Sequence, residues 1–201
     1  MWRLLAVVSC FLLAACYGSG KRGGNNALEI HDFGPPATEV QARSVRGELA
    51  LEVRAPLWMD SLAIQYRLLY AEPTRLREYT QARWAGPTAQ MIQQRLMQKL
   101  SLALAGQSRS RCVLRVDIDE FSQRFETSEA SRGVLLVRVQ ILDRSRGLVA
   151  ARAINVEKPA PTPDSRGGVA ALTATVDQLA IDLSAWENEL RVSGKLAGCL
   201  G

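Results

Sequence analysis

The chain contains 201 residues, of which 47% are hydrophobic and 22% are charged, and its formal net charge is +5. This length and composition are typical of a single globular domain with a hydrophobic core. The basic excess is mostly arginine spread through the chain, which excludes the clustered basic face of a nucleic-acid-binding protein.

The first sixteen residues have the pattern of a bacterial lipoprotein signal. Arg3 supplies a positive charge and Leu4 to Leu13 form an apolar run. That run is too short to cross a membrane as a helix, but it has the length of the apolar region of a secretory signal peptide. The small residues Ala14 and Ala15 directly precede Cys16. The pattern predicts a signal peptide over residues 1–15 and covalent lipid on Cys16. We expect no cofactor besides this lipid.

The residues after the signal predict an anchored domain on a tether. Aspartate after the lipidated cysteine commonly retains lipoproteins in the inner membrane of enteric bacteria. Tyr17 stands there instead, so we expect an outer-membrane anchor and a domain that faces the periplasm. Residues 16–27 are Gly-rich and polar, which indicates a flexible tether. One folded domain is expected over residues 28–201, where no apolar run is long enough to span a bilayer.

The first folded segments are predicted to be strands. Residues 49–54 alternate apolar and polar side chains, and Pro56 follows them, which indicates a strand that ends there. Residues 61–70 and 77–84 are two further β-like runs. Residues 72–74 carry turn chemistry between them, so we expect a hairpin.

A helix is predicted after Gly86 and Pro87, because proline fits the first turn of a helix. Gln and Lys side chains fill most of the polar face, and Gly106 is the expected C-terminal stop. The apolar side chains recur every fourth residue, at Ile92, Leu96, Leu100 and Leu104.

The second half is predicted to form three strands and a second helix. The strands are expected at residues 114–118, 135–142 and 148–156. The apolar phase shifts after Ile118, which predicts a β-bulge near Asp119 and Glu120. Apolar residues from Val169 to Leu190 are spaced alternately by three and four, the clearest helix signal in the chain. The order βββα-βββα indicates an α+β fold, a mixed or antiparallel sheet with two main helices packed on it.

Candidate reactive groups are few, and no enzymatic activity is predicted. His31 is the single histidine, and the chain has neither a nucleophile elbow nor a P-loop. Asp117, Asp119 and Glu120 could bind a metal ion from one strand. The solvent side of that strand explains the same three carboxylates, so no metal site is predicted.

Two cysteines are left once Cys10 is removed with the signal and Cys16 is lipidated. An oxidising periplasm favours a disulfide between Cys112 and Cys199. The alternative is two separate cysteines, one of them buried. The sequence leaves both open, because it cannot supply the Cα separation that a disulfide requires.

Four short segments carry a family resemblance. Residues 55–60 (APLWMD), 64–67 (IQYR) and 79–87 (YTQARWAGP) lead into the first predicted helix. Together with the signal, the chain length and the element order, they resemble the ABC-type transport auxiliary lipoproteins, the PqiC-like family. Residues 31–34 (HDFG) are similar to the family's opening Y-x-L-G segment, with His31 in place of tyrosine and Phe33 in place of leucine. The resemblance covers roughly residues 28–190.

The resemblance implies an outer-membrane-anchored auxiliary component of an ABC-type, MCE-linked lipid transport system. Its partners would be an MCE-domain protein that bridges the periplasm and ABC transporter or permease subunits, and homo-oligomeric rings are among the assemblies it allows. The alternative is a structural or assembly lipoprotein of the envelope without a role in lipid transport. No catalytic residues are implied. The candidate partner-binding or motif residues are Trp58, Asp60, Tyr66, Arg67, Tyr79, Arg83 and Trp84. For Arg83 and Trp84, a role in stabilising the hairpin–helix corner is an equally open interpretation.

Overall fold

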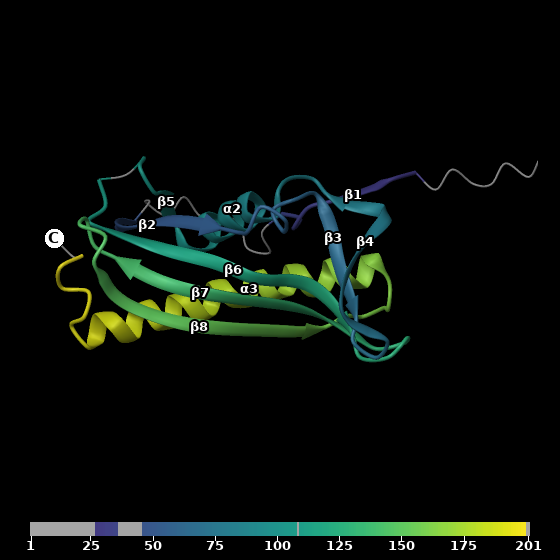
Figure 1. The fold of residues 1–201 in the computed structure, drawn as a ribbon. Helices are drawn as coiled ribbons and strands as arrows, with labels where there is room; N and C mark the ends of the chain where they lie inside the picture. The colour runs from purple at the N-terminus through teal and green to yellow at the C-terminus, as the bar shows by residue number, and fades with distance from the viewer. Residues whose placement is uncertain (1–26, 36–45, 108, 200–201) are drawn as a thin grey trace, which may run out of the picture.

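The structure, a computed structural model, describes residues 27–35, 46–107 and 109–199. The predicted signal peptide, Cys16 and most of the tether lie outside these residues. The described residues form one mixed eight-stranded sheet and two helices, which confirms the α+β architecture (Figure 1). Neither helix combines the length and the apolar character that a membrane span needs.

The strands join into one sheet around the long strand β6. One edge of β6 pairs with β7, and β8 follows β7; both pairings are antiparallel. The other edge of β6 is shared by β2 and β3, and both run parallel to it. Strand β5 then flanks β2, while β4 and β1 follow β3. The elements are β1 Glu29–His31, β2 Arg46–Arg54, β3 Ala63–Leu68, β4 Glu72–Trp84, α2 Thr88–Leu100, β5 Leu102–Leu104, β6 Cys112–Phe125, β7 Ser131–Leu142, β8 Leu148–Pro159 and α3 Ser165–Val192.

One hydrophobic core lies between the sheet and the two helices. Helix α3 lies along β7 and β8, and α2 packs beside β2 (Figure 1). Alternate residues of the strands face the helices because successive side chains on a strand point to opposite faces. The core side chains that are almost completely buried include Leu51, Val116, Ile118, Leu135, Val139, Ile141, Ile92, Leu96, Leu172, Val176 and Leu179.

The predicted bulge in β6 is confirmed, and one of the three carboxylates of the acidic cluster beside it is buried. The pairing of β6 with β7 shifts between Ile118 and Glu120. Asp119 stays exposed and pairs with Arg138, whereas Glu120 is only 9% exposed and its Oε1 accepts a hydrogen bond from Arg67 Nε at 3.1 Å. Glu120 stays on the sheet face of Asp117, because Ile118 and Phe121 on either side of the bulge both face the core, but Arg67, Ser122 and Arg124 cover it. The prediction that all three carboxylates lie in solvent is therefore wrong for Glu120.

Two predicted boundaries are also wrong. Helix α2 ends at Leu100 rather than at Gly106, because Ser101 adopts a left-handed backbone (φ 55°) and residues 102–104 pair with β2 as strand β5. Residues 72–74 belong to β4, and the hairpin turn precedes them at residues 69–71. Pro73 is tolerated there because the β3–β4 pairing is irregular at that point.

A buried arginine links the two helices. Arg95 of α2 is 4% exposed, and its Nε and Nη2 donate to the two carboxylate oxygens of Asp177 in α3 at 2.8 and 3.0 Å. Its Nη1 also donates to the carbonyl of Gly34 at 3.2 Å. Burial raises the pKa of Asp177, but hydrogen bonds and charges from Arg95 and Lys99 outweigh it and hold that pKa below its usual value. The ionised pair therefore stabilises the fold.

Asp177→Asn is expected to lower the free energy of unfolding by about 1–3 kcal/mol at pH 7, because Arg95 then stays buried without its anion. The carboxylate of Asp177 has a depressed pKa, so its contribution is complete above the unfolded-state value near 3.9 and is lost as the pH falls through the folded-state value. The difference between wild type and variant should thus shrink below about pH 4.

Urea unfolding at pH 7 and pH 3 measures both effects. Asp182→Asn is the matched control, because Asp182 lies on the same helix and accepts a hydrogen bond from Gln178. The control should change stability by less than about 0.5 kcal/mol. A loss for Asp177→Asn that is equally large at pH 3 would contradict the charge-based explanation.

Candidate docking surface

The loop between β2 and β3 holds two large apolar side chains in solvent. The backbone N–H groups of Met59 and Asp60 both donate to the carbonyl of Pro56, at 2.9 and 3.0 Å, and form a compact turn. Met59 points inward and is 2% exposed. Leu57 and Trp58 point outward and are 95% and 58% exposed. The turn therefore presents Leu57 and Trp58 on a fixed backbone.

The same loop is attached to the start of helix α2. Pro87 occupies the position before the helix and provides no side-chain cap. The Asp60 Oδ1 atom accepts a hydrogen bond from the N–H of Ala89 at 2.9 Å, which satisfies one of the free donors at a helix N-terminus. A carboxylate is also favoured there by the helix dipole. Asp60 thus fixes the position of the loop.

The exposed side chain of Arg83 lies beside this loop. Strand register places Arg83 between Ile30 of β1 and Ala63 of β3. The next residue, Trp84, donates its N–H to the carbonyl of Leu62 at 2.7 Å, which joins β4 to the end of the loop. We call the exposed side chains of this region the corner patch: Ile30, Leu57, Trp58, Leu62 and Arg83.

Trp84 itself belongs to the core. Its side chain is 1% exposed, and its ring lies 5.4 Å from the ring of Phe33 and 5.9 Å from that of Phe121. Phe121 faces the core because of the β6 bulge. These three aromatic rings fill the space under β1, β4 and β6, so the side chain of Trp84 is not accessible to a partner.

The other motif residues form contacts between the hairpin and β6. The rings of Tyr66 and Tyr79 lie 4.6 Å apart, and the Tyr79 hydroxyl donates to Oε1 of Gln123 at 2.8 Å. Burial raises the pKa of Tyr79 well above its usual value, so the hydroxyl stays protonated. Arg67 pairs with Glu120, as described above. These side chains hold the β3–β4 hairpin against strand β6.

The structure thus separates the seven motif residues into two groups. Trp58 and Arg83 are exposed at the corner patch, whereas the other five make contacts inside the domain. The motif did not indicate Ile30, Leu57 or Leu62 as surface residues. For Leu57, a signal was present in the sequence: two consecutive large apolar residues directly after Pro56, outside any alternating pattern.

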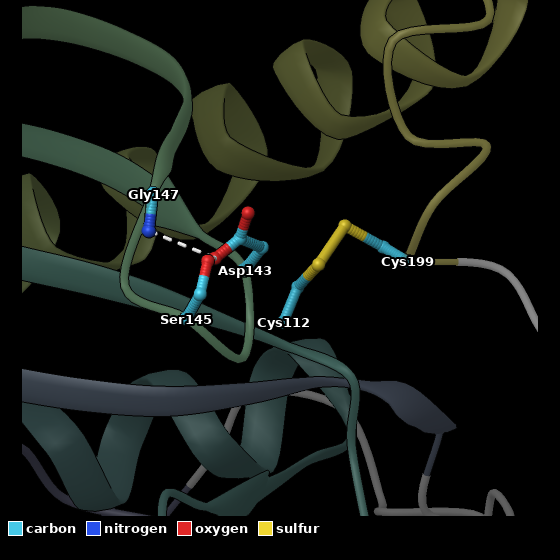
Figure 2. Close-up of a disulfide and its surroundings, with 5 residues drawn as sticks. All are labelled: Cys112, Asp143, Ser145, Gly147 and Cys199. Carbon is cyan, nitrogen blue, oxygen red and sulfur yellow. Dashed lines mark hydrogen bonds between the residues drawn. A yellow bond between two sulfur atoms is a disulfide. The ribbon is translucent and has the colours of Figure 1, made fainter.

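The C-terminal tail closes the opposite end of the core. Cys112, the first residue of β6, and Cys199 form a disulfide, with sulfur atoms 2.03 Å apart and Cα atoms 5.4 Å apart (Figure 2). Both cysteines are buried, and Leu196 in the same tail is fully buried. The tail is therefore covalently tied to the start of the central strand.

The corner patch has the residue types of a protein-binding surface. No group of three or more His, Cys, Asp or Glu side chains within the described ranges could hold a metal ion. The corner patch combines tryptophan, aliphatic side chains and an arginine, and Trp and Arg are enriched among residues that contribute most to protein–protein affinity.

Comparisons with known proteins agree with the resemblance. The sequence profile of the "ABC-type transport auxiliary lipoprotein component" family matches residues 32–184. A crystal structure of a Xanthomonas campestris protein is similar, with a TM-score of 0.59 and 23% identity, over 69% of this chain and 81% of that chain. An uncharacterized protein has a TM-score of 0.61 and 14% identity, over 79% of this chain and 97% of that one. No curated protein matches the sequence.

Proposed function

Because the chain belongs to the ABC-type transport auxiliary lipoprotein family, we propose that it serves an MCE-linked lipid transport system from the outer membrane. In this proposal the lipid on Cys16 anchors the chain, the Gly-rich tether gives it reach, and the folded domain docks to an MCE-domain protein that bridges the periplasm. ABC transporter or permease subunits would complete the system. Family membership already makes the chain a lipoprotein of the cell envelope and an auxiliary component of ABC-type transport.

The corner patch is the observation that carries the docking part of the proposal. Four large apolar side chains are between 39% and 95% exposed around it, and exposed apolar groups of this kind mark interaction sites when they gather in one region. The loop is held by Pro56 and Asp60, so little order would have to be gained on binding. Trp58 and Arg83 are of the residue types that most often contribute strongly to the affinity of protein–protein interfaces.

Site-specific photocrosslinking in the bacterial envelope tests the docking face. A photoreactive phenylalanine replaces Trp58 in the full chain with a C-terminal tag. The matched control replaces Leu148, which is 62% exposed and lies at the β7–β8 turn. We expect a crosslink to an MCE-domain protein from position 58 and none from position 148. Cys16→Ala should abolish the crosslink, because the chain is then no longer anchored.

A substitution experiment measures the contribution of the patch. The double variant Leu57→Ser with Trp58→Ser should reduce recovery of the MCE-domain protein at least about tenfold in a pull-down. Its thermal unfolding should stay close to that of wild type, because both side chains lie in solvent. Recovery of no MCE-domain or transporter subunit by the lipidated, folded chain would overturn the proposal. The structural or assembly role would then become the better explanation.

A further inference from the structure

A pocket rimmed by arginines lies at the end of the sheet near the disulfide. Its volume is about 300 Å³, and it opens between the loop that follows β5 and the β7–β8 turn. Arg111 directly precedes β6, Arg115 lies near the start of β6, and Arg144 and Arg146 come from the turn. Strand β1, which contributes Ile30 to the corner patch, lies at the other end of the molecule (Figure 1). The pocket and the patch are therefore separate sites.

The charges around this pocket do not cancel. Arg115 pairs with Glu52, Nε to Oε2 at 3.0 Å. The side chains of Arg111, Arg144 and Arg146 make no hydrogen bond or ion pair with the part of the chain that the structure describes. Glu52 and Asp143 are the two acidic residues that line the pocket, so four guanidinium groups against two carboxylates leave two positive charges.

The turn that carries two of the arginines is held in a fixed shape. Asp143 accepts hydrogen bonds from the Ser145 hydroxyl at 2.6 Å and the Gly147 N–H at 2.8 Å (Figure 2). These bonds hold the pKa of Asp143 below its usual value, so the carboxylate stays ionised. It remains hydrogen-bonded to groups of its own turn. The N–H of Arg146 also donates to the Asp143 carbonyl at 3.0 Å. Arg146 adopts a left-handed backbone (φ 65°) that glycine would fit more easily.

The pocket is also lined by two apolar strand residues. Val113 of β6 and Leu142 of β7 are strand partners on the sheet face that points away from the helices. Further along the same face the partners are polar, with Arg115 opposite Gln140 and Asp117 opposite Arg138. A lining that combines apolar side chains with several guanidinium groups suits a ligand that has both an anionic group and a short apolar part.

We propose that this pocket binds a phosphate ester, such as the headgroup and glycerol of an anionic phospholipid or a free phosphate monoester. The planar guanidinium group matches phosphate oxygens in bidentate geometry, and it keeps its charge at every relevant pH. The pocket volume lies at the lower end of the range for small-molecule sites. The inference does not depend on docking to an MCE-domain protein.

Calorimetric titration of the full chain in a non-ionic detergent tests the site with four probes: inorganic phosphate, glycerol 3-phosphate, dihexanoyl phosphatidic acid and dihexanoyl phosphatidylcholine. The test variant is Arg144→Ser with Arg146→Gly, because glycine tolerates the left-handed backbone at position 146. The matched control is Arg75→Ser with Arg166→Ser, which removes two exposed charges away from the pocket. Arg111→Ser is a second, single variant outside the turn.

Dihexanoyl phosphatidic acid should bind, and phosphatidylcholine should bind at least about tenfold more weakly, because its headgroup carries a compensating cation. The double variant and Arg111→Ser should each weaken binding about tenfold or more, while the control leaves it unchanged. Tighter binding of phosphatidic acid than of glycerol 3-phosphate identifies a lipid headgroup as the ligand, and equal binding identifies a free phosphate ester. Absence of binding by every phosphate probe, or an equal loss in the control, would overturn the proposal.

Discussion

Trp84→Ala is expected to lower the free energy of unfolding by about 3–5 kcal/mol, the range found when a buried aromatic side chain is removed from a core. Trp84 is 1% exposed and touches two other aromatic rings, those of Phe33 and Phe121. Its removal leaves a cavity under three strands that cannot collapse without moving β1 or β4. Denaturation by urea, followed by circular dichroism, measures the loss.

Trp58→Ala is the matched control, because it removes the same side chain from the same family motif. Trp58 is 58% exposed, so its replacement should change the free energy of unfolding by less than about 0.5 kcal/mol. Trp84→Phe should recover part of the stability, because it keeps an aromatic ring in the core. Equal losses for Trp58→Ala and Trp84→Ala would contradict the division of the motif into a surface group and a core group.

The long strands and both helices could be predicted because their periodicity is local. Alternation over residues 135–142 and the spacing from Val169 to Leu190 each span enough residues to identify the element. The bulge near Asp119 was also visible as a change of phase. Strands β1 and β5 have three residues each and carry no period of their own. They form because β1 pairs in parallel with β4 and β5 pairs in parallel with β2. Such pairing cannot be predicted from the local sequence of so short a strand.

The candidate site was predictable only as a motif. Trp58 and Trp84 occupy comparable places in it, yet one is exposed and the other is buried. The difference depends on the turn at Pro56 and on strand pairing between residues far apart in the chain. The arginine pocket had no sequence signal, because its four arginines come from around the start of β6 and from a turn about 30 residues later. Their proximity results from the β6–β7 pairing.

Replacing both Cys112 and Cys199 with alanine is expected to lower the free energy of unfolding by about 2–4 kcal/mol, the typical contribution of a disulfide. The two cysteines are 87 residues apart, and the chain-entropy model gives about 4–5 kcal/mol for a loop of that length. The lower expectation allows for residual structure in the unfolded chain. Urea unfolding of the oxidised wild type and of the double variant measures the loss.

Reduction of the wild type provides an independent control for this prediction, because it breaks the bond without changing any side-chain volume. Reduced wild type should approach the stability of the double variant. Unchanged stability after complete reduction, verified by a thiol assay, would contradict a stabilising role for the bond. The consequence extends beyond stability, because Cys112 directly follows Arg111 at the rim of the arginine pocket. Release of the tail should therefore also weaken phosphate-ester binding, whereas binding at the corner patch, at the other end of the sheet, should be unchanged.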